Sequence, residues 1–102
     1  MPHYRIYYAR QLPDLNTPPA TRATVAQTHV LVHALDAGGL AQVYARMQAE
    51  AWPATDAMLA FGERVHALGS FHTSMSAGDV AHDCTTDTSY QCTFFDGWRE
   101  LE

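Results

Sequence analysis

The chain opens on an alternation of apolar and polar residues that predicts a strand over residues 3–9. Every second residue from Tyr4 to Tyr8 faces one side of that strand, because side chains alternate between the two faces of a sheet. A second β-rich run predicts another strand over residues 28–35. The prolines and small polar residues of segment 11–27, which lies between the two runs, predict a loop.

The middle of the chain follows a helical period instead. Apolar residues recur at three- and four-residue spacings over 37–51 and again over 55–68, and each set predicts one stripe of an amphipathic helix. Asp36 is predicted to cap the first helix, because its carboxylate can accept the free backbone N–H groups of the first turn. Gly69 is predicted to end the second helix, since glycine readily takes the left-handed conformation found there.

The last quarter of the chain predicts a β-hairpin. Segments 79–83 and 89–95 are rich in residues that favour strands, Asp96-Gly97 predicts a turn, and residues 98–101 predict a short edge strand. The predicted order is therefore β-β-α-α-β-β. It describes an α+β fold with a single small β-sheet and two helices packed on one face. The chain of 102 residues has room for one domain and one modest core.

Charge is distributed unevenly along the chain, whose net charge is −5. Residues 1–78 hold five acids and five arginines and sum to zero, whereas residues 79–102 hold six acids and only Arg99. Nucleic-acid binders usually carry the opposite sign, so we expect no direct nucleic-acid binding. The acidic segment is typical of a solvated surface, and it also suits a basic protein partner or an imitation of phosphate groups. The chain has no lysine, which excludes Schiff-base and P-loop lysine chemistry.

The apolar runs are too short to predict a membrane protein. No run approaches the ~20 residues that span a bilayer, and the first residues contain no apolar signal region. We therefore expect a cytoplasmic protein with no membrane partner and no cofactor. In that compartment Cys84 and Cys92 are expected as free thiols, although a cross-strand disulfide is a geometric alternative. The sequence leaves a homo-oligomer open.

The most conspicuous segment reads His72-Thr73-Ser74-Met75-Ser76-Ala77-Gly78-Asp79-Val80, and we call residues 72–80 the signature loop. We predict a tight turn held by Ser and Asp side chains that bond nearby backbone amides. Gly78 is predicted to supply a positive φ, and Met75 to enter the core. The alternative is a nucleophilic Ser74 or Ser76 activated by His72, but no nucleophile-elbow pattern accompanies these residues.

Two histidine-containing sets are candidates for a metal. His29 and His33 share a face of a strand, but they would lie roughly 13 Å apart at ~3.3 Å per residue, which is too far for one ion. The other set is His82, Asp83, Cys84 and Cys92. If the hairpin pairs Cys84 with Cys92, these cysteines and His82 point to one side of the sheet. This set lacks the Cys-x2-Cys spacing of a strong zinc motif. The sequence therefore favours two thiols without metal.

The signature loop resembles that of an uncharacterised small-protein family of bacterial, haloarchaeal and phage or plasmid genomes, which carries His-Thr-Ser-Met-Ser-Val-Gly-Asp-Val. In that family a hairpin with Tyr-x-Cys and a later Gly-Trp or Gly-Phe follow, and here Tyr90-Gln91-Cys92 and Gly97-Trp98 match them. The chain departs from the signature at Ala77. A looser relative of the signature, Ser-Leu-Ser-x-x-Asp-Val, is similar to the core of YodL-like domains of mobile elements. The resemblance implies a mobile-DNA context, and it carries over no catalytic residue.

The leading hypothesis is a non-enzymatic protein-binding module from a mobile element, which modulates host machinery or defence. The signature loop would shape its surface and the tail, residues 98–102, would contact the partner, because Trp and Arg dominate binding hot spots. One alternative is a small hydrolytic or metal-binding protein that uses His72, Ser74 and Asp79, or else His82, Cys84 and Cys92. Another is an acidic phosphate mimic that inhibits a DNA-binding protein. The binding residues of the leading hypothesis are His72, Ser74, Ser76, Asp79, Trp98 and Arg99.

Overall fold

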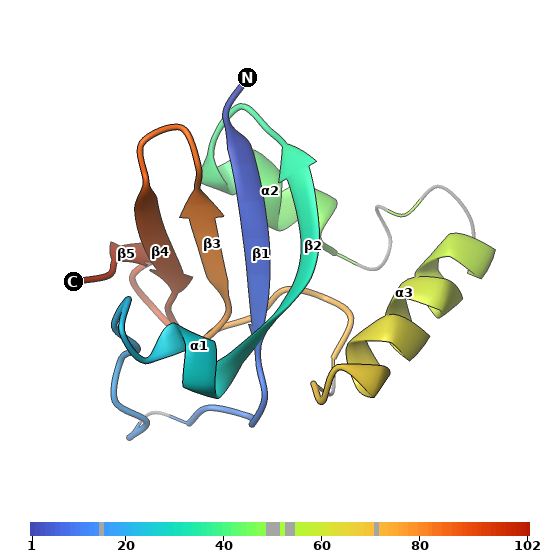
Figure 1. Cartoon of the computed structure of the whole chain (residues 1–102), viewed down its shortest axis with the longest axis horizontal. Helices are drawn as coiled ribbons and strands as arrows, with labels where there is room; N and C mark the ends of the chain where they lie inside the picture. The colour runs from blue at the N-terminus through green and yellow to red at the C-terminus, as the bar shows by residue number, and fades with distance from the viewer. Residues whose placement is uncertain (15, 49–51, 53–54, 71) are drawn as a thin grey trace.

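A computed structural model of the chain describes residues 1–14, 16–48, 52, 55–70 and 72–102. Its five strands form one antiparallel sheet in the order β2-β1-β3-β4-β5 (Figure 1). The predicted small α+β protein with a single sheet is therefore confirmed. In chain order the elements are β1 (His3–Ala9), α1 (Val25–Thr28), β2 (His29–Asp36), α2 (Leu40–Arg46), α3 (Thr55–Ala67), β3 (Val80–Asp83), β4 (Thr88–Cys92) and β5 (Trp98–Glu100).

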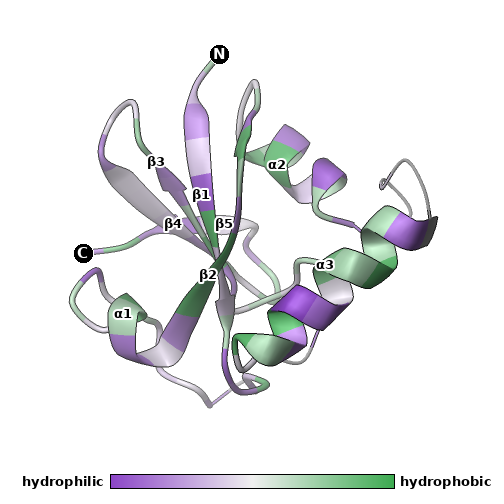
Figure 2. Ribbon diagram, turned by 45° about the vertical axis from the view of Figure 1, so that its right-hand side comes forward, coloured by the Kyte–Doolittle hydropathy of each residue, from purple (hydrophilic) through white to green (hydrophobic). Residues whose placement is uncertain are grey.

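The main core lies on the face of β1 that carries Tyr4, Ile6 and Tyr8, all of which are buried. This burial confirms the predicted alternation. The same cluster draws residues from β2, β3, both longer helices and the signature loop, and Met75 is buried in it as predicted. In Figure 2, green hydrophobic residues recur along α3 between purple hydrophilic ones, the mixed pattern of an amphipathic helix. The other buried members are Val30, Val32, Ala37, Val43, Met47, Phe61, Val65 and Ala81.

The opposite face of the sheet is covered by part of the segment that was predicted as a loop. Val25 of α1 packs there with Val80 and Leu101, and Tyr7 packs against them. In Figure 1, α1 lies in front of the sheet and α2 lies behind it. The prediction omitted α1, because a four-residue helix with one buried apolar residue leaves no periodic stripe in the sequence.

The helix α2 is not capped by Asp36, so that prediction is wrong. Asp36 is the last residue of β2, and its carboxylate lies 2.7 Å from Nδ1 of His3. The N-cap of α2 is Gly39, with φ at 145°. The helix begins three residues later than predicted because strand β2 continues to Asp36 and the two glycines follow it. The predicted helix residues 49–51 lie outside the described residues.

Gly69 follows the C-terminus of α3, as the sequence predicted. Gly69 has φ at 95°, and its N–H donates to the carbonyl of His66 at 3.0 Å. The N–H of Ser70 donates to the carbonyl of Val65 at 3.1 Å. This pair of bonds is a Schellman motif, which satisfies carbonyls that the helix end would otherwise leave unpaired.

A β-bulge in β2 separates the two histidines that were candidates for a metal. The register between β1 and β2 shifts between Ile6 and Tyr7, which leaves Val32 as an extra residue. His33 therefore lies opposite Ile6, whereas His29 lies opposite the last residue of β1, on the face of Tyr7. The expectation that His29 and His33 share a face is wrong, because a bulge changes which side the following residues face.

The register of the β3–β4 hairpin also differs from the one considered for the cysteines. Asp83 pairs with Thr88, so Cys84 falls in the hairpin loop. Cys92 lies at the other end of β4, where its N–H donates to the carbonyl of Asp79 at 2.8 Å. The register that would pair Cys84 with Cys92 is therefore not the one adopted.

Candidate functional site

The signature loop is organised around the carboxylate of Asp79, which is fully buried. One oxygen accepts the N–H of Ala9 at 2.9 Å, and the other accepts the N–H of Ser76 at 2.9 Å. That second oxygen also lies 2.6 Å from Nε2 of His72. Because an ionised carboxylate only accepts hydrogen bonds, Nε2 carries the proton. Asp79 thus connects the loop to the end of β1, and it also connects residues 72 and 76 of the loop to each other. A buried carboxylate needs such hydrogen-bond partners.

Tyr8 supports the histidine of this group from the core side. The rings of Tyr8 and His72 stack with centroids 4.4 Å apart and an interplanar angle of 14°. The Tyr8 hydroxyl donates to the carbonyl of Thr73 at 2.9 Å. Burial, and secondarily the Asp79 carboxylate, raise the pKa of the Tyr8 hydroxyl. It therefore stays protonated and keeps its role as a donor to the loop.

Gly78 fastens the other side of the signature loop, and its φ of 97° confirms the predicted positive value. Its carbonyl lies 2.6 Å from Nε2 of His29 and accepts the side-chain amide of Gln91 at 3.1 Å. A carbonyl has two lone pairs, so these two donors fill it. Two buried side chains from β2 and β4 thus hold one peptide group of the loop.

The two serines of the signature loop differ in their surroundings. Ser76 is exposed, and Asp79 engages its backbone N–H and not its hydroxyl. Ser74 is half-buried. A histidine oriented by a carboxylate is one element of a hydrolytic site, but the chemistry also needs an oxyanion hole that substrate can reach. The His72 side chain is 15% exposed and lines neither of the two cavities described below.

A second Ser–His–Asp arrangement escaped the sequence analysis, because its members meet only through the hairpin register. The Ser89 hydroxyl lies 2.7 Å from Nδ1 of His82, and Nε2 of His82 lies 3.2 Å from the Asp87 carboxylate. Arg22 also reaches that carboxylate, at 3.0 Å. Ser89 is only 8% exposed and lines neither cavity. The group therefore ties the hairpin turn to the segment before α1.

The candidate metal ligands do not gather. In the part of the chain that the structure describes, no three His, Cys, Asp or Glu side chains form a group that could hold a metal ion. Cys84 and Cys92 carry free thiols and are half-buried. Burial, and secondarily the nearby Asp79, raise the pKa of the Cys92 thiol. Both effects make Cys92 a poorer thiolate ligand and nucleophile.

The turn between β4 and β5 presents two aromatic residues that the sequence analysis did not single out. Phe94 is 48% exposed and Phe95 is 83% exposed. They lie in a turn closed by Thr93, whose N–H donates to the carbonyl of Gly97 at 2.7 Å. Trp98, predicted as a contact residue, is half-buried and packs against the main core. We call residues 93–99, which end at the exposed Arg99, the C-terminal turn.

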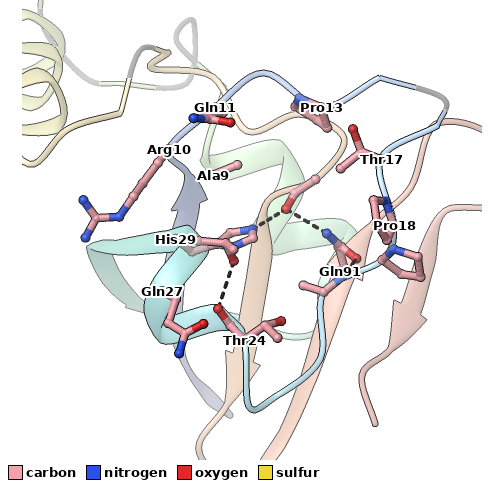
Figure 3. Close-up of a pocket in the computed structure, with 14 residues that line it drawn as sticks. Ala9, Arg10, Gln11, Pro13, Thr17, Pro18, Thr24, Gln27, His29 and Gln91 are labelled. Atoms are coloured by element: carbon pink, nitrogen blue, oxygen red, sulfur yellow. Dashed lines mark hydrogen bonds between the residues drawn. The ribbon is translucent and has the colours of Figure 1, made fainter.

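Two cavities are lined by the proline-rich segment, residues 11–14 and 16–20. One, of about 370 Å³, is lined by residues of this segment and of the C-terminal turn, including Phe95 and Arg99. The other, of about 460 Å³, reaches from the same segment to His29 (Figure 3). The cavities adjoin, and they share Pro13, Thr17, Pro18, Pro19, Gly78 and Gln91.

Backbone hydrogen bonds connect the signature loop with the C-terminal turn. The N–H of Gly78 donates to the carbonyl of Cys92 at 2.8 Å, and Cys92 pairs with Trp98 across β4 and β5. A change in the conformation of the signature loop would therefore displace the base of the C-terminal turn.

Comparison with protein-family models, with curated proteins and with solved structures gives no match to this chain. The family resemblance of the signature loop consequently stays a prediction. In the described part of the chain, no helix combines the length and apolar character that crossing a bilayer requires.

Proposed function

We propose that this protein is a non-enzymatic binding module that contacts a partner protein through its C-terminal turn. The observation that carries the proposal is the exposure of Phe95, at 83%, beside Phe94 and above a cavity. Clustered exposed apolar groups mark interaction sites. Aromatic residues and arginine supply most of the energy at protein interfaces, and Arg99 adjoins the two phenylalanines in the same cavity.

The proposal assigns different tasks to the residues that the sequence singled out. Asp79 is fully buried and does not reach a partner, so its task is to shape the loop. His72, Ser74 and Ser76 belong to the same loop and act with it. Trp98 supports the turn from the core side, while Arg99 and the two phenylalanines make contact. Substitution of Trp98 would disturb the core as well as the surface, so Phe95 is the sharper test.

The negative charge of residues 79–102 favours a basic partner. Residues 79–102 carry the whole net charge of −5, and Asp96 and Glu100 are exposed in or beside the C-terminal turn. Complementary charges accelerate the association of two proteins, and added salt weakens this attraction because it screens the charges. The same charge supports the alternative of a phosphate mimic that blocks a DNA-binding protein. In that alternative, binding depends on the acidic side chains of residues 79–102 and is retained in Phe95→Ala.

The biological setting that we propose is a mobile element whose product acts in the host cytoplasm on host machinery or defence. Its support is the resemblance of the signature loop to those of phage and plasmid proteins. We therefore choose a lysate of the host as the source of the partner.

The test is affinity capture from that lysate with the tagged full chain and with Phe95→Ala. Leu59→Ala is the matched control, because Leu59 is an exposed apolar residue, 56% exposed, on α3. We expect one stoichiometric protein that is retained by the wild type and by Leu59→Ala and is lost with Phe95→Ala. Equal retention by all three chains would contradict the proposal.

A further inference from the structure

The larger cavity has the size of a small-molecule site. Its volume is about 460 Å³, within the range of roughly 300–1,000 Å³ found for ligand pockets. It is bounded by the end of β1, by α1 and the start of β2, and by the proline-rich segment (Figure 3). We call it the proline pocket. It extends away from the C-terminal turn, which lines only the other cavity.

The polar groups at the base of the proline pocket are already engaged within the protein. The Gln91 side chain accepts the N–H of Ala20 at 3.1 Å and donates to the carbonyl of Gly78. His29 uses one ring nitrogen on the same carbonyl and the other on the Thr28 hydroxyl, at 2.7 Å. Since these groups have little left to offer a ligand, the interior acts as an apolar cavity bounded by proline rings.

The rim of the pocket is different, because it carries polar side chains that are not engaged. Arg10, Gln11 and Gln27 are exposed and line the pocket. Within the described residues, the structure gives their side chains no hydrogen-bond partner. Arg10 also bears the only full charge among the described lining residues, and no carboxylate lines the pocket, although the chain as a whole has a net charge of −5.

We propose that the proline pocket binds a small monocarboxylate with an apolar body. The apolar body would lie between the rings of Pro13 and Pro18, and the carboxylate would stay at the rim. There Arg10 supplies a charge-assisted, bidentate donor pair, and the carboxamide of Gln27 supplies a further donor. A cation or a dicarboxylate fits less well, because the pocket offers one positive charge and no negative one.

The Arg10 side chain has to change its conformation before it can bind a carboxylate at the rim of the pocket. Figure 3 shows its guanidinium directed away from the interior. Its Nη1 lies 3.5 Å from the position that a Cβ on Gly69 would occupy. The three-methylene stem and the exposed position of Arg10 allow it to swing over the mouth without disturbing the core. Binding should therefore move the amide resonances of Arg10 and Gly69 together with those of the pocket.

The test is an NMR titration of the ¹⁵N-labelled full chain with phenylacetate and, separately, with phenylacetamide, which has the same body without the charge. We expect phenylacetate to shift amides of the proline pocket and to bind about tenfold more tightly than phenylacetamide. Arg10→Gln should weaken phenylacetate binding by about tenfold. Arg5→Gln is the matched control, since Arg5 is an exposed arginine of β1 outside the pocket, and it should bind as the wild type does.

Three outcomes would overturn the inference. They are equal affinity for the acid and the amide, unchanged acid binding in Arg10→Gln, and no pocket shifts with phenylacetate at about 10 mM, roughly tenfold above a Kd of 1 mM. Gln27→Trp provides a second variant that fills the rim, and Ala26→Trp on the same helix, outside the pocket, is its control. Loss of binding with the first and retention with the second would support the site, whereas equal behaviour would contradict it.

Discussion

His72 and Asp79, at opposite ends of the signature loop, meet with 2.6 Å between Nε2 and a carboxylate oxygen. The other oxygen of that carboxylate holds the backbone of Ala9 at the end of β1. The segment that looks most like a catalytic motif in the sequence is therefore also the joint between the loop and the sheet. Gly78 completes the joint from the other side through His29 and Gln91.

Replacement of Asp79 by Asn should strongly destabilise the fold. An Asn side chain presents its NH₂ to at least one of the three N–H donors that now face the Asp79 carboxylate. Each buried group left without a partner typically costs about 1–3 kcal/mol. Urea unfolding followed by circular dichroism measures the difference. Ser76→Ala is the control, and it should stay within about 0.5 kcal/mol of the wild type, because only the backbone of Ser76 bonds to Asp79. Equal effects of the two variants would contradict the assignment.

Substitution of two glycines by alanine should separate backbone strain from steric overlap. A Cβ on Gly78 would lie 2.7 Å from Cγ of Pro13, at φ 97°, whereas a Cβ on Gly97, at φ 72°, meets nothing within 4 Å. Gly97→Ala should therefore cost about 1 kcal/mol, from strain alone. Gly78→Ala should lower the free energy of unfolding by about 1–3 kcal/mol more than strain alone does, because its Cβ would overlap Pro13. Thermal or urea unfolding of both variants checks this ranking. A larger loss of unfolding free energy in Gly97→Ala than in Gly78→Ala would be inconsistent with the geometry of the signature loop.

The stability of the protein should fall as the pH drops below 6.5, in part through His33. Burial among Trp52 and Phe61, and secondarily Arg64, lower the pKa of His33 from its ordinary 6.5. The unfolded chain therefore takes up a proton at this position at a pH where the folded chain does not. Between 6.5 and the lowered pKa, the unfolded state binds more protons and the free energy of unfolding decreases with falling pH.

His33→Gln removes that linkage. Urea unfolding between pH 7 and pH 5 should show a smaller decrease for this variant than for the wild type. An identical slope in the two proteins would show that His33 does not contribute.

The Cys92 thiol should react slowly with iodoacetamide. Burial, and secondarily Asp79, raise its pKa above the ordinary 9.0, so less thiolate is present near neutral pH. In Cys84→Ser, alkylation of the folded chain should be slower than alkylation of the same chain in urea, as followed by intact mass. If the folded and unfolded rates agree, Cys92 is not protected as the structure indicates.

Much of the fold could be predicted, because it is encoded locally. The alternation around Ile6, the glycine after α3 and the buried Met75 each follow from a few neighbouring residues. Other features depend on partners far along the chain. The bulge at Val32 appears only when β2 meets β1, and the short helix around Val25 forms a cover for Val80 and Leu101. Neither has a periodic signal of its own.

The candidate site likewise combines residues that the sequence could identify with residues that only the fold brings together. His72 and Asp79 stand in one motif and could be selected from the sequence, but Ala9, His29 and Gln91 join them only through the sheet. The exposure of Phe94 and Phe95 was missed for a different reason. An apolar pair after Cys92 favours continuation of a strand, whereas the Thr93–Gly97 bonds end β4 and turn both rings outward.

Amide hydrogen exchange of this chain, alone and in complex with the captured partner, tests most directly which surface makes contact. We expect new protection in residues 93–99 and in the adjoining proline-rich segment, with little change in α3 or at Asp79, which is already buried. Protection concentrated on α3, or on residues 72–76 with none at 93–99, would contradict the assignment of the C-terminal turn as the binding surface.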